Sequence, residues 1–358
     1  SLPAGEKLSP PLLYLLAATE NIIFAAGNVA LALNKYMPEK EYEILILHRG
    51  LSKNNEEALL KIPKVRLQYY DFPEGFEEHM LSPRTGLPRG RWNNPNCLVA
   101  AAHFEIFGYL DIYKTVIWID VDMSIQAEIN ELEKYGPIAQ ALDLNYNQIW
   151  TVRDQFTKYL LDFDMSGNGY INSVIVVNDQ LENYSIYKDE CYKLARKYAP
   201  YLKNLDQAVF ALLFQKYSII PEVLPWNEYT CHAHHEAAAI AKIVHFGCTD
   251  KVWNNSLLFQ CYPEWFRVHM EWLKLGGCDF DRSSISSKAI WSELNTLSQS
   301  FGETNNKFSS IPNKIAVLYK KLEKNPSVAY LANKKLINKN GEDYTLRDLL
   351  KAIYKKIK

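Results

Sequence analysis

A chain of 358 residues with 48% hydrophobic and 23% charged residues has the composition of a soluble globular protein, in one large domain or two smaller ones. Its net charge of −1 gives no reason to expect nucleic-acid binding by the chain as a whole. The six cysteines are scattered without a C-x-x-C pair, which argues against a zinc cluster and requires no disulfide.

Apolar runs that suit strands alternate along the chain with segments that suit helices. The predicted strands are 12–18, 43–48, 65–70, 115–119, 171–178 and 243–246. A first helical pattern starts at Val29, and further helices are predicted over 98–112, 183–198 and 204–216. Residues 71–96, rich in Pro, Gly, Arg and Asn, predict a long loop of the kind that often binds ligands. This order predicts an α/β fold with a largely parallel sheet.

After about residue 280 the composition becomes rich in Ser, Asn, Lys and Gln, which predicts a boundary between 1–280 and 281–358. Residues 314–358 carry 12 Lys/Arg against 4 Asp/Glu, a local charge of +8. A capping sequence at Thr345 opens an amphipathic basic helix. Such a helix suits an anionic membrane surface, or alternatively packs on the catalytic domain or on a second copy in a homodimer. We expect a cytoplasmic protein, held peripherally on the inner face of the membrane where the tail binds lipid.

Asp120 and Asp122 directly follow the uncharged β-branched run 115–119. Residues i and i+2 of an extended segment point to the same side, so both carboxylates aim at one spot beyond the strand. Ligands of open α/β sheets bind outside the carboxyl ends of strands, and Mg²⁺ or Mn²⁺ prefers carboxylates plus substrate phosphates. The alternative interpretation is a pair of solvated loop aspartates.

Three further segments carry polar groups at predicted element ends. His245 ends a strand and can complete a Mn²⁺ site, or is a hydrogen-bonded core histidine; Lys251 follows at a spacing that suits a phosphate. Asn172 and Ser173 offer donors and acceptors to sugar hydroxyls, or serve turn chemistry. Asp206 opens a helix and alternatively caps it. The segment 231–235 (CHAHH) is interpreted as a loop lining an acceptor cleft rather than as a metal cluster.

In this order and spacing, D-x-D after a strand, Y-I-N-S before another, L-D-Q on a helix and H-F-x-x-x-x-K-x-W resemble glycosyltransferase family 8. The resemblance covers roughly residues 12–255. It implies a GT-A fold over 1–280, with a nucleotide-sugar half at 1–125, an acceptor half at 126–280, and a mostly helical basic extension at 281–358. It also implies a UDP-sugar donor, Mn²⁺ (or Mg²⁺), and transfer with retention at the anomeric carbon.

The resemblance assigns roles to individual residues. Asp120, Asp122 and His245 match the metal ligands, and Gln207 with Asp206 matches the catalytic pair beside the anomeric carbon. The implied donor contacts are Ala17, Thr19, Asn21, His103, Asp120, Val121, Asp143, Asn172, Ser173, Asp206, Gly247 and Lys251. The sequence departs from the family pattern where Thr19 replaces an aspartate, Ile22 replaces the tyrosine that stacks on uracil, and His103 replaces an arginine.

The expected function is transfer of a hexose from UDP-galactose or UDP-glucose to a glycan or lipid-linked glycan, such as lipopolysaccharide or capsule. Gln207 is a poor covalent nucleophile, which favours front-face attack by the acceptor hydroxyl over double displacement. The alternatives are a glycoside hydrolase that uses paired carboxylates and a non-catalytic module that binds glycans or nucleotide sugars.

Overall fold

The computed structural model describes residues 11–82, 95–147, 162–164, 166–247, 251–281, 335–337 and 343–345. The basic tail contributes β11 (Lys335–Ile337) and β12 (Asp343–Thr345), which pair antiparallel. The expected helix after Thr345, and with it most of the proposed membrane-binding segment 314–358, lies outside the described residues. No helix in the described part of the chain is long and apolar enough to cross a membrane.

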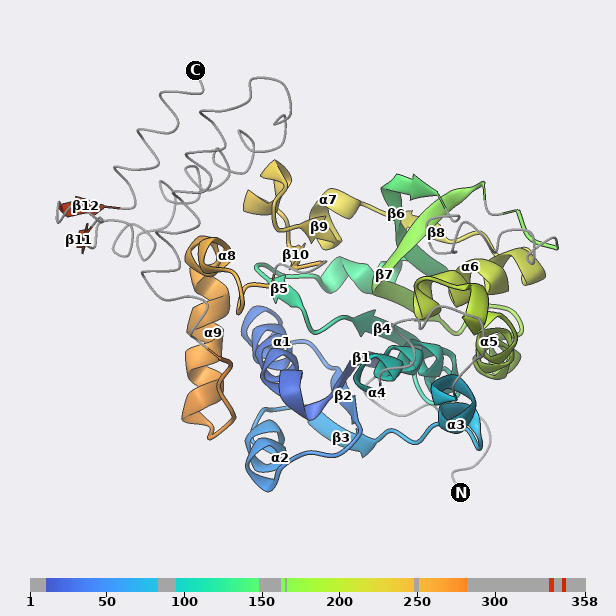
Figure 1. The fold of residues 1–358 in the computed structure, drawn as a ribbon, viewed down its shortest axis with the longest axis horizontal. Coiled ribbons are helices and arrows are strands. Elements are labelled where there is room, and N and C mark those ends of the chain that lie inside the picture. The colour runs from blue at the N-terminus through green and yellow to red at the C-terminus, as the bar shows by residue number, and fades with distance from the viewer. Residues whose placement is uncertain are drawn as a thin grey trace, which may run out of the picture.

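A seven-stranded, mostly parallel sheet forms the centre of the molecule, with the strand order β3-β2-β1-β4-β7-β6-β8 (Figure 1). In this sheet β1, β2, β3 and β4 are mutually parallel. β7 runs antiparallel to both β4 and β6, and β8 is parallel to β6. Their bounds are β1 (Leu12–Ala18), β2 (Glu43–His48), β3 (Val65–Tyr69), β4 (Thr115–Ile119), β6 (Ile138–Asn147), β7 (Asn168–Asn178) and β8 (Glu222–Leu224). One sheet therefore joins strands from both expected halves of 1–280.

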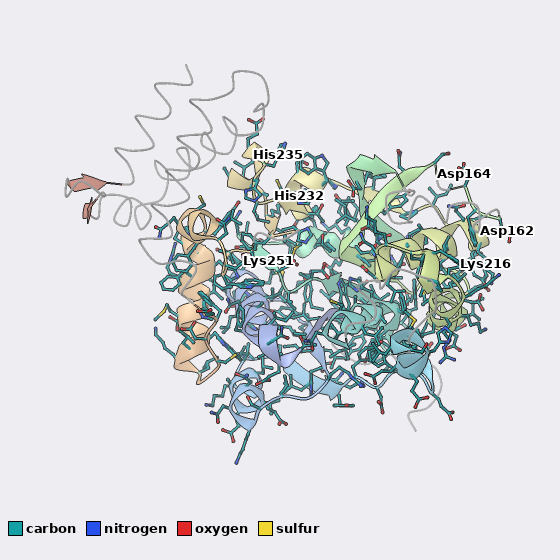
Figure 2. The ribbon with its side chains drawn as sticks, in the orientation of Figure 1. Asp162, Asp164, Lys216, His232, His235 and Lys251 are labelled. Atoms are coloured by element: carbon teal, nitrogen blue, oxygen red, sulfur yellow. The ribbon has the colours of Figure 1, made fainter. Side chains whose placement is uncertain are left out.

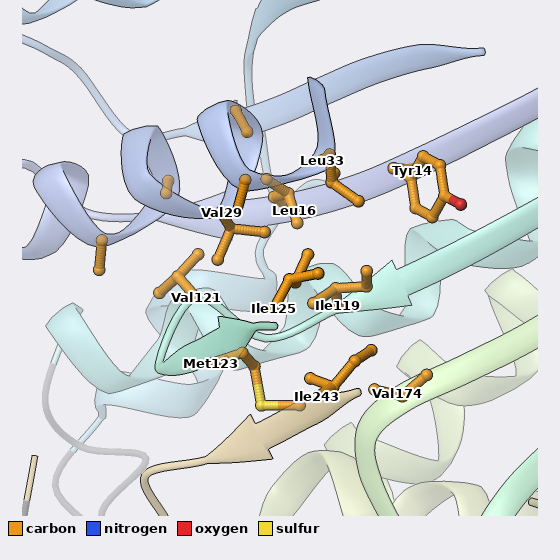
Figure 3. Packing of buried hydrophobic residues seen from close by; sticks show 14 of the residues in the cluster. Tyr14, Leu16, Val29, Leu33, Ile119, Val121, Met123, Ile125, Val174 and Ile243 are labelled. Carbon is orange, nitrogen blue, oxygen red and sulfur yellow. The ribbon is translucent and has the colours of Figure 1, made fainter. Parts of the chain in front are cut away.

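Alternation along β1 divides the core into two layers. Leu12, Tyr14 and Leu16 pack on one face of the sheet, and Leu13 and Leu15 pack on the other. All five side chains are at most 1% exposed, because helices cover both faces, and this explains why the strand reads as one continuous apolar run. Figure 3 shows the first layer, where Tyr14 and Leu16 meet side chains of α1 and of the strands that follow.

Helices α1 and α9 cover the first face, and η3, α5 and α6 cover the second. At Gly27 of α1, an added Cβ would lie 2.5 Å from Trp272 of α9, so only glycine permits this close helix contact. The helical segments are η1 (Glu20–Ile22), α1 (Ile23–Tyr36), α2 (Lys53–Leu60), α3 (Phe76–Leu81), α4 (Pro95–Leu98), η3 (Val99–Tyr109), η4 (Asn130–Lys134), α5 (Tyr184–Tyr198), η7 (Ala199–Tyr201), α6 (Leu205–Tyr217), α7 (Trp226–Tyr229), η8 (Glu236–Ala239), α8 (Ser256–Cys261) and α9 (Pro263–Lys274).

A second, three-stranded sheet stands beside the first and was not predicted. It has the order β5-β10-β9, formed by β5 (Met123–Ile125), β10 (Ile243–His245) and β9 (Cys231–His232). β5 begins immediately after Asp122, and its antiparallel pairing with β10 sets Met123 opposite His245. Two segments more than 100 residues apart in the sequence thereby meet at the end of β4.

Three of the predicted helices and loops differ from the structure. The first helix begins at Ile23, before the predicted start at Val29. The expected loop 71–96 contains α3, which buries Phe76 and Met80 against the second layer of the core. The expected helix 98–112 begins as the short α4 and continues as a 3₁₀ helix over 99–109. The segment 99–109 is almost wholly apolar, which explains why it is buried. A segment that is apolar all round has no periodicity by which an α-helix can be told from a 3₁₀ helix, and this explains the incorrect prediction.

Candidate active site

Asp120 and Asp122 lie on a turn that is pinned from both sides. The backbone N–H of Asp120 donates to the carbonyl of Ser173 at 2.9 Å, which extends the pairing of β4 with β7. The carbonyl of Asp122 accepts from the N–H of Phe246 at 2.9 Å, which extends the pairing of β5 with β10. Main-chain hydrogen bonds from two different sheets therefore fix where the two carboxylates stand.

The structure brings together the three residues that the sequence offered as metal ligands. One ligand atom each of Asp120, Asp122 and His245 lie within 4.8 Å of one another, and all three residues are partly buried. Two carboxylates and an imidazole are a donor set that suits Mn²⁺, or Mg²⁺ less well because it prefers oxygen alone. The donor chemistry and spacing fit a divalent ion that is completed by phosphate oxygens.

Asp122 is also held by the side chains of a histidine and a lysine. Its carboxylate contacts His245 Nε2 at 3.4 Å and forms an ion pair with Lys251, whose Nζ also donates to the carbonyl of Phe246 at 2.7 Å. Burial alone would raise the pKa of Asp122, but the charges and hydrogen bonds of His245 and Lys251 outweigh it and hold that pKa well below its usual range. The carboxylate is therefore ionised at any pH at which the protein works.

Asp120 has a separate set of partners on the η3 side. Trp118 stands two residues earlier on the same face of β4, and its indole N–H donates to Asp120 Oδ1 at 2.7 Å. His103 of η3 is only 5% exposed, lies against the Trp118 ring with centroids 3.9 Å apart, and places Nε2 3.2 Å from the same oxygen. The second carboxylate oxygen of Asp120 has neither of these contacts.

His103 also faces Asp206 in the first turn of α6, with Nε2 3.8 Å from its Oδ2. Burial disfavours the imidazolium, but the Asp120 and Asp206 carboxylates more than compensate, so the pKa of His103 is raised. Burial and the nearby charge of Asp120 raise the pKa of Asp206, against the opposing effect of His103. The N-cap residue of α6 is Asn204, and the Asp206 carboxylate accepts hydrogen bonds from backbone N–H groups of the first turn while it also contacts His103 and Asn172.

Asn172 and Ser173 lie on β7 behind this group and are 5% and 2% exposed. The Asn172 amide nitrogen donates to Asp206 Oδ2 at 3.3 Å. The register of β6 against β7 shifts after Gln140, so Asn172 falls in an irregular part of the sheet. Such irregularities re-aim side chains beside functional sites, and this one directs Asn172 toward α6.

The remaining expected donor contacts are spread over several elements. Asp143 is on β6 opposite Gly169, and Gln207 is partly exposed in the first turn of α6. Ala17 is partly exposed near the end of β1, and the Thr19 hydroxyl bonds to the side chain of Asn21.

Two more expected contacts adjoin the metal-ligand group. The side chain of Val121 is 7% exposed and belongs to the apolar core, where Figure 3 shows it near Val29. A Cβ on Gly247 would lie 3.2 Å from the His245 ring and 3.3 Å from the His232 ring, so the backbone passes close to both. The residues next in the chain, 248–250, lie outside the described residues.

His232, which belongs to the segment 231–235 that was predicted as a loop, lies on β9 and is a neighbour of the site. Its ring stacks on that of His245, with centroids 5.6 Å apart and 24° between the planes, because β9 pairs with β10 in register. Burial and the charge of His245 lower the pKa of His232 to about 4, which makes it neutral at pH 7. In Figure 2, His232 and Lys251 lie left of the centre of the view, and Lys216 and Asp164 lie on the right. In the described part of the chain, the His/Cys/Asp/Glu group with metal-site spacing is that of Asp120, Asp122 and His245, not 231–235.

No family model matches the sequence, and a search of curated proteins finds no match. Solved structures do match. The bifunctional glycosyltransferase WbbM superposes with a TM-score of 0.53 at 15% identity, over 75% of this chain and 53% of WbbM. The galactosyltransferase LgtC, solved with donor and acceptor sugar analogues, gives a TM-score of 0.55 at 13% identity, over 72% of this chain and 95% of LgtC.

This chain has a glycosyltransferase fold. The resemblance found in the sequence is thereby confirmed for the architecture, which is the expected mostly parallel GT-A sheet flanked by helices. At identities of 13% and 15%, the likeness concerns the fold alone. The chemistry has to be argued from the site.

Proposed function

We propose that the protein is a divergent member of glycosyltransferase family 8, which transfers a hexose from a UDP-sugar to a hydroxyl of a glycan with Mn²⁺ and with retention of configuration. The observation that carries this proposal is the grouping of Asp120, Asp122 and His245 with Lys251 at the end of β4, in a glycosyltransferase fold. UDP-galactose and UDP-glucose are the favoured donors, and a lipid-linked glycan of lipopolysaccharide or capsule type is the favoured acceptor. The proposed location is cytoplasmic, on the inner face of the membrane.

Asp120, Asp122 and His245 would hold the divalent ion, which neutralises charge on the departing diphosphate when bound. Lys251 is placed to add a second positive charge to the same phosphates. Asp206 and Asn172, fixed against each other at 3.3 Å, would receive the hydroxyls of the donor sugar. Gln207, the next residue of α6, would present its carbonyl oxygen to the anomeric carbon as positive charge develops there. The acceptor hydroxyl attacks from the side of the leaving phosphate and gives its proton to that phosphate.

Release of UDP from a set of UDP-sugars, with and without Mn²⁺, tests this proposal directly. We expect one or two UDP-hexoses to be hydrolysed slowly with Mn²⁺, and hydrolysis to stop when EDTA is added. Hydrolysis of glycosides without metal would support a glycoside hydrolase instead. Binding of UDP-sugars without any turnover, with or without candidate glycan acceptors, would support a non-catalytic module.

Gln207→Ala is expected to lower kcat about 10- to 100-fold and to change the affinity for the donor by less than threefold. The reason is that its carbonyl acts on charge that exists only in the transition state. The matched control is Gln215→Ala on the same helix, whose side chain bonds to the backbone of Asp164 and should leave kcat unchanged. NMR of the product should show the α configuration of the donor; a β linkage would contradict the proposed retaining mechanism.

A further inference from the structure

Gln140 is an amide side chain in a position that the fold would fill with an apolar residue. It is 0% exposed on the interior strand β6, between Ala139 and Ala141, and it pairs with Ile175 on one side and Val223 on the other. Its carbonyl oxygen has no hydrogen-bond partner among the described residues. A buried polar atom left in this way destabilises the fold. Packing and stability alone therefore do not explain a glutamine here.

The other end of the same amide has a partner in the site. Gln140 Nε2 donates to Asn172 Oδ1 at 2.6 Å, in a fully buried contact between β6 and β7. The contact forms at the place where the register of the two strands shifts. With its oxygen committed to Gln140, Asn172 has only its amide nitrogen to offer to Asp206, which it meets at 3.3 Å.

The contact continues past Asp206 to the metal-ligand group. Asp206 Oδ2 lies 3.8 Å from His103 Nε2, and that nitrogen lies 3.2 Å from Asp120 Oδ1. Gln140 thus stands at the buried end of a chain of polar contacts that runs through Asn172 and Asp206 to Asp120. It is wholly removed from solvent, and its hydrogen bond toward the site is the one to Asn172.

We infer that Gln140 is a positioning residue, which fixes the orientation of the Asn172 amide and thereby the place of the Asp206 carboxylate. Without a hydrogen-bond donor at position 140, the side chain at that position no longer holds the amide oxygen of Asn172 on the β6 side. A rotated amide would turn its oxygen toward the Asp206 carboxylate and push it away. This inference rests on the proposed function for its effect on turnover, but the contact itself can be tested without any substrate.

Gln140→Met keeps the length of the side chain and removes the donor. We expect kcat for donor hydrolysis to fall at least tenfold and binding of UDP with Mn²⁺ to change less than twofold. We expect the melting temperature to change little, because the substitution removes one buried unpaired oxygen, that of Gln140, and leaves another, Asn172 Oδ1, without its donor. Gln215→Met, which loses a glutamine near the far end of α6, is the matched control and should keep wild-type kcat.

Asn172→Ala supplies the second arm of a double-mutant cycle. If Gln140 acts through Asn172, adding Gln140→Met to Asn172→Ala should lower kcat by less than a further twofold. In the metal-free protein, the side-chain amide signals of Asn172, assigned by their loss in Asn172→Ala, should shift in Gln140→Met and not in Gln215→Met.

Three results would overturn the inference. The first is a wild-type kcat in Gln140→Met. The second is an equal loss of kcat when Gln140→Met is added to the wild-type protein and to Asn172→Ala. The third is that the amide signals of Asn172 do not shift in Gln140→Met. A loss of kcat that follows a loss of melting temperature would assign Gln140 to packing and would overturn it as well. If the wild-type protein hydrolyses no UDP-sugar, the proposed function fails, and the amide signals still decide whether Gln140 orients Asn172.

Discussion

Asp122→Asn is expected to reduce Mn²⁺-dependent hydrolysis and transfer at least a thousandfold. The substitution removes one of two carboxylates from the group that would hold the ion, and it removes the charge that opposes Lys251 and His245. Asparagine keeps the shape of the side chain and the carbonyl hydrogen bond to Phe246, which is made by the backbone. The measurement is the initial rate of UDP release across a series of Mn²⁺ concentrations, together with calorimetric binding of Mn²⁺.

The fold should survive this substitution. Loss of the contacts to His245 and Lys251 is expected to lower the free energy of unfolding by about 1–3 kcal/mol, which a domain of this size tolerates. Asp71→Asn is the matched control, because the Asp71 side chain is 87% exposed and lies 3.5 Å from Arg49, away from the metal-ligand group. Full activity of Asp122→Asn in the presence of EDTA would end the metal hypothesis.

Much of the fold follows from the sequence because its strands are long and buried on both faces. β1, β2 and β4 have the predicted bounds, since an uninterrupted apolar run between polar ends leaves little choice of register. β6 was not predicted, because polar residues such as Gln140 and Asp143 interrupt its apolar residues. β5, β8 and β9 were not predicted either, because strands of two or three residues offer few positions in which a pattern can be detected. Their pairing depends on contacts between distant segments, which a local pattern does not contain.

The residues of the site likewise divide into those that the sequence could predict and those that it could not. Asp120, Asp122, His245 and Lys251 could be singled out because each follows a predicted strand and together they form a spaced motif. Their converging positions confirm the expectation that the three candidate ligands meet. Besides meeting one another, the two carboxylates have separate partners, since Asp120 contacts His103 and Asp122 pairs with Lys251.

The supporting residues could not be found from the motif alone. Trp118 reads as one more apolar residue of its strand, although its place two residues before Asp120 is a signal that the periodicity could have supplied. Gln140 reads as an interruption between two alanines, and His232 as one of several loop histidines. What gives each of them a role is a partner on another element, and that partner is known only from the fold.

Lys251→Met is expected to lower UDP-sugar turnover about 100- to 1,000-fold and to tighten binding of Mn²⁺ alone about tenfold. The two effects have opposite signs because Lys251 pairs with protein groups in the structure and would pair with the donor diphosphate when that is bound. In the structure its Nζ pairs with Asp122 and the carbonyl of Phe246. A divalent ion at Asp122 must displace or share this ammonium group, and removing a positive charge from beside the ion favours ion binding.

When the sugar diphosphate binds, the effect of Lys251 is expected to become favourable, because the two negative phosphates provide its new partner. Methionine keeps most of the side-chain volume and loses only the charge. Lys274→Met, at the exposed end of α9 where Lys274 pairs with Glu271 at 2.7 Å, is the matched control and should change neither quantity. Calorimetry with Mn²⁺ alone and initial rates with the UDP-sugar separate the two effects. Weaker Mn²⁺ binding in Lys251→Met would show that Lys251 supports the ligand geometry of Asp122 instead of competing with the ion. Wild-type turnover in Lys251→Met would exclude the proposed contact of Lys251 with the diphosphate.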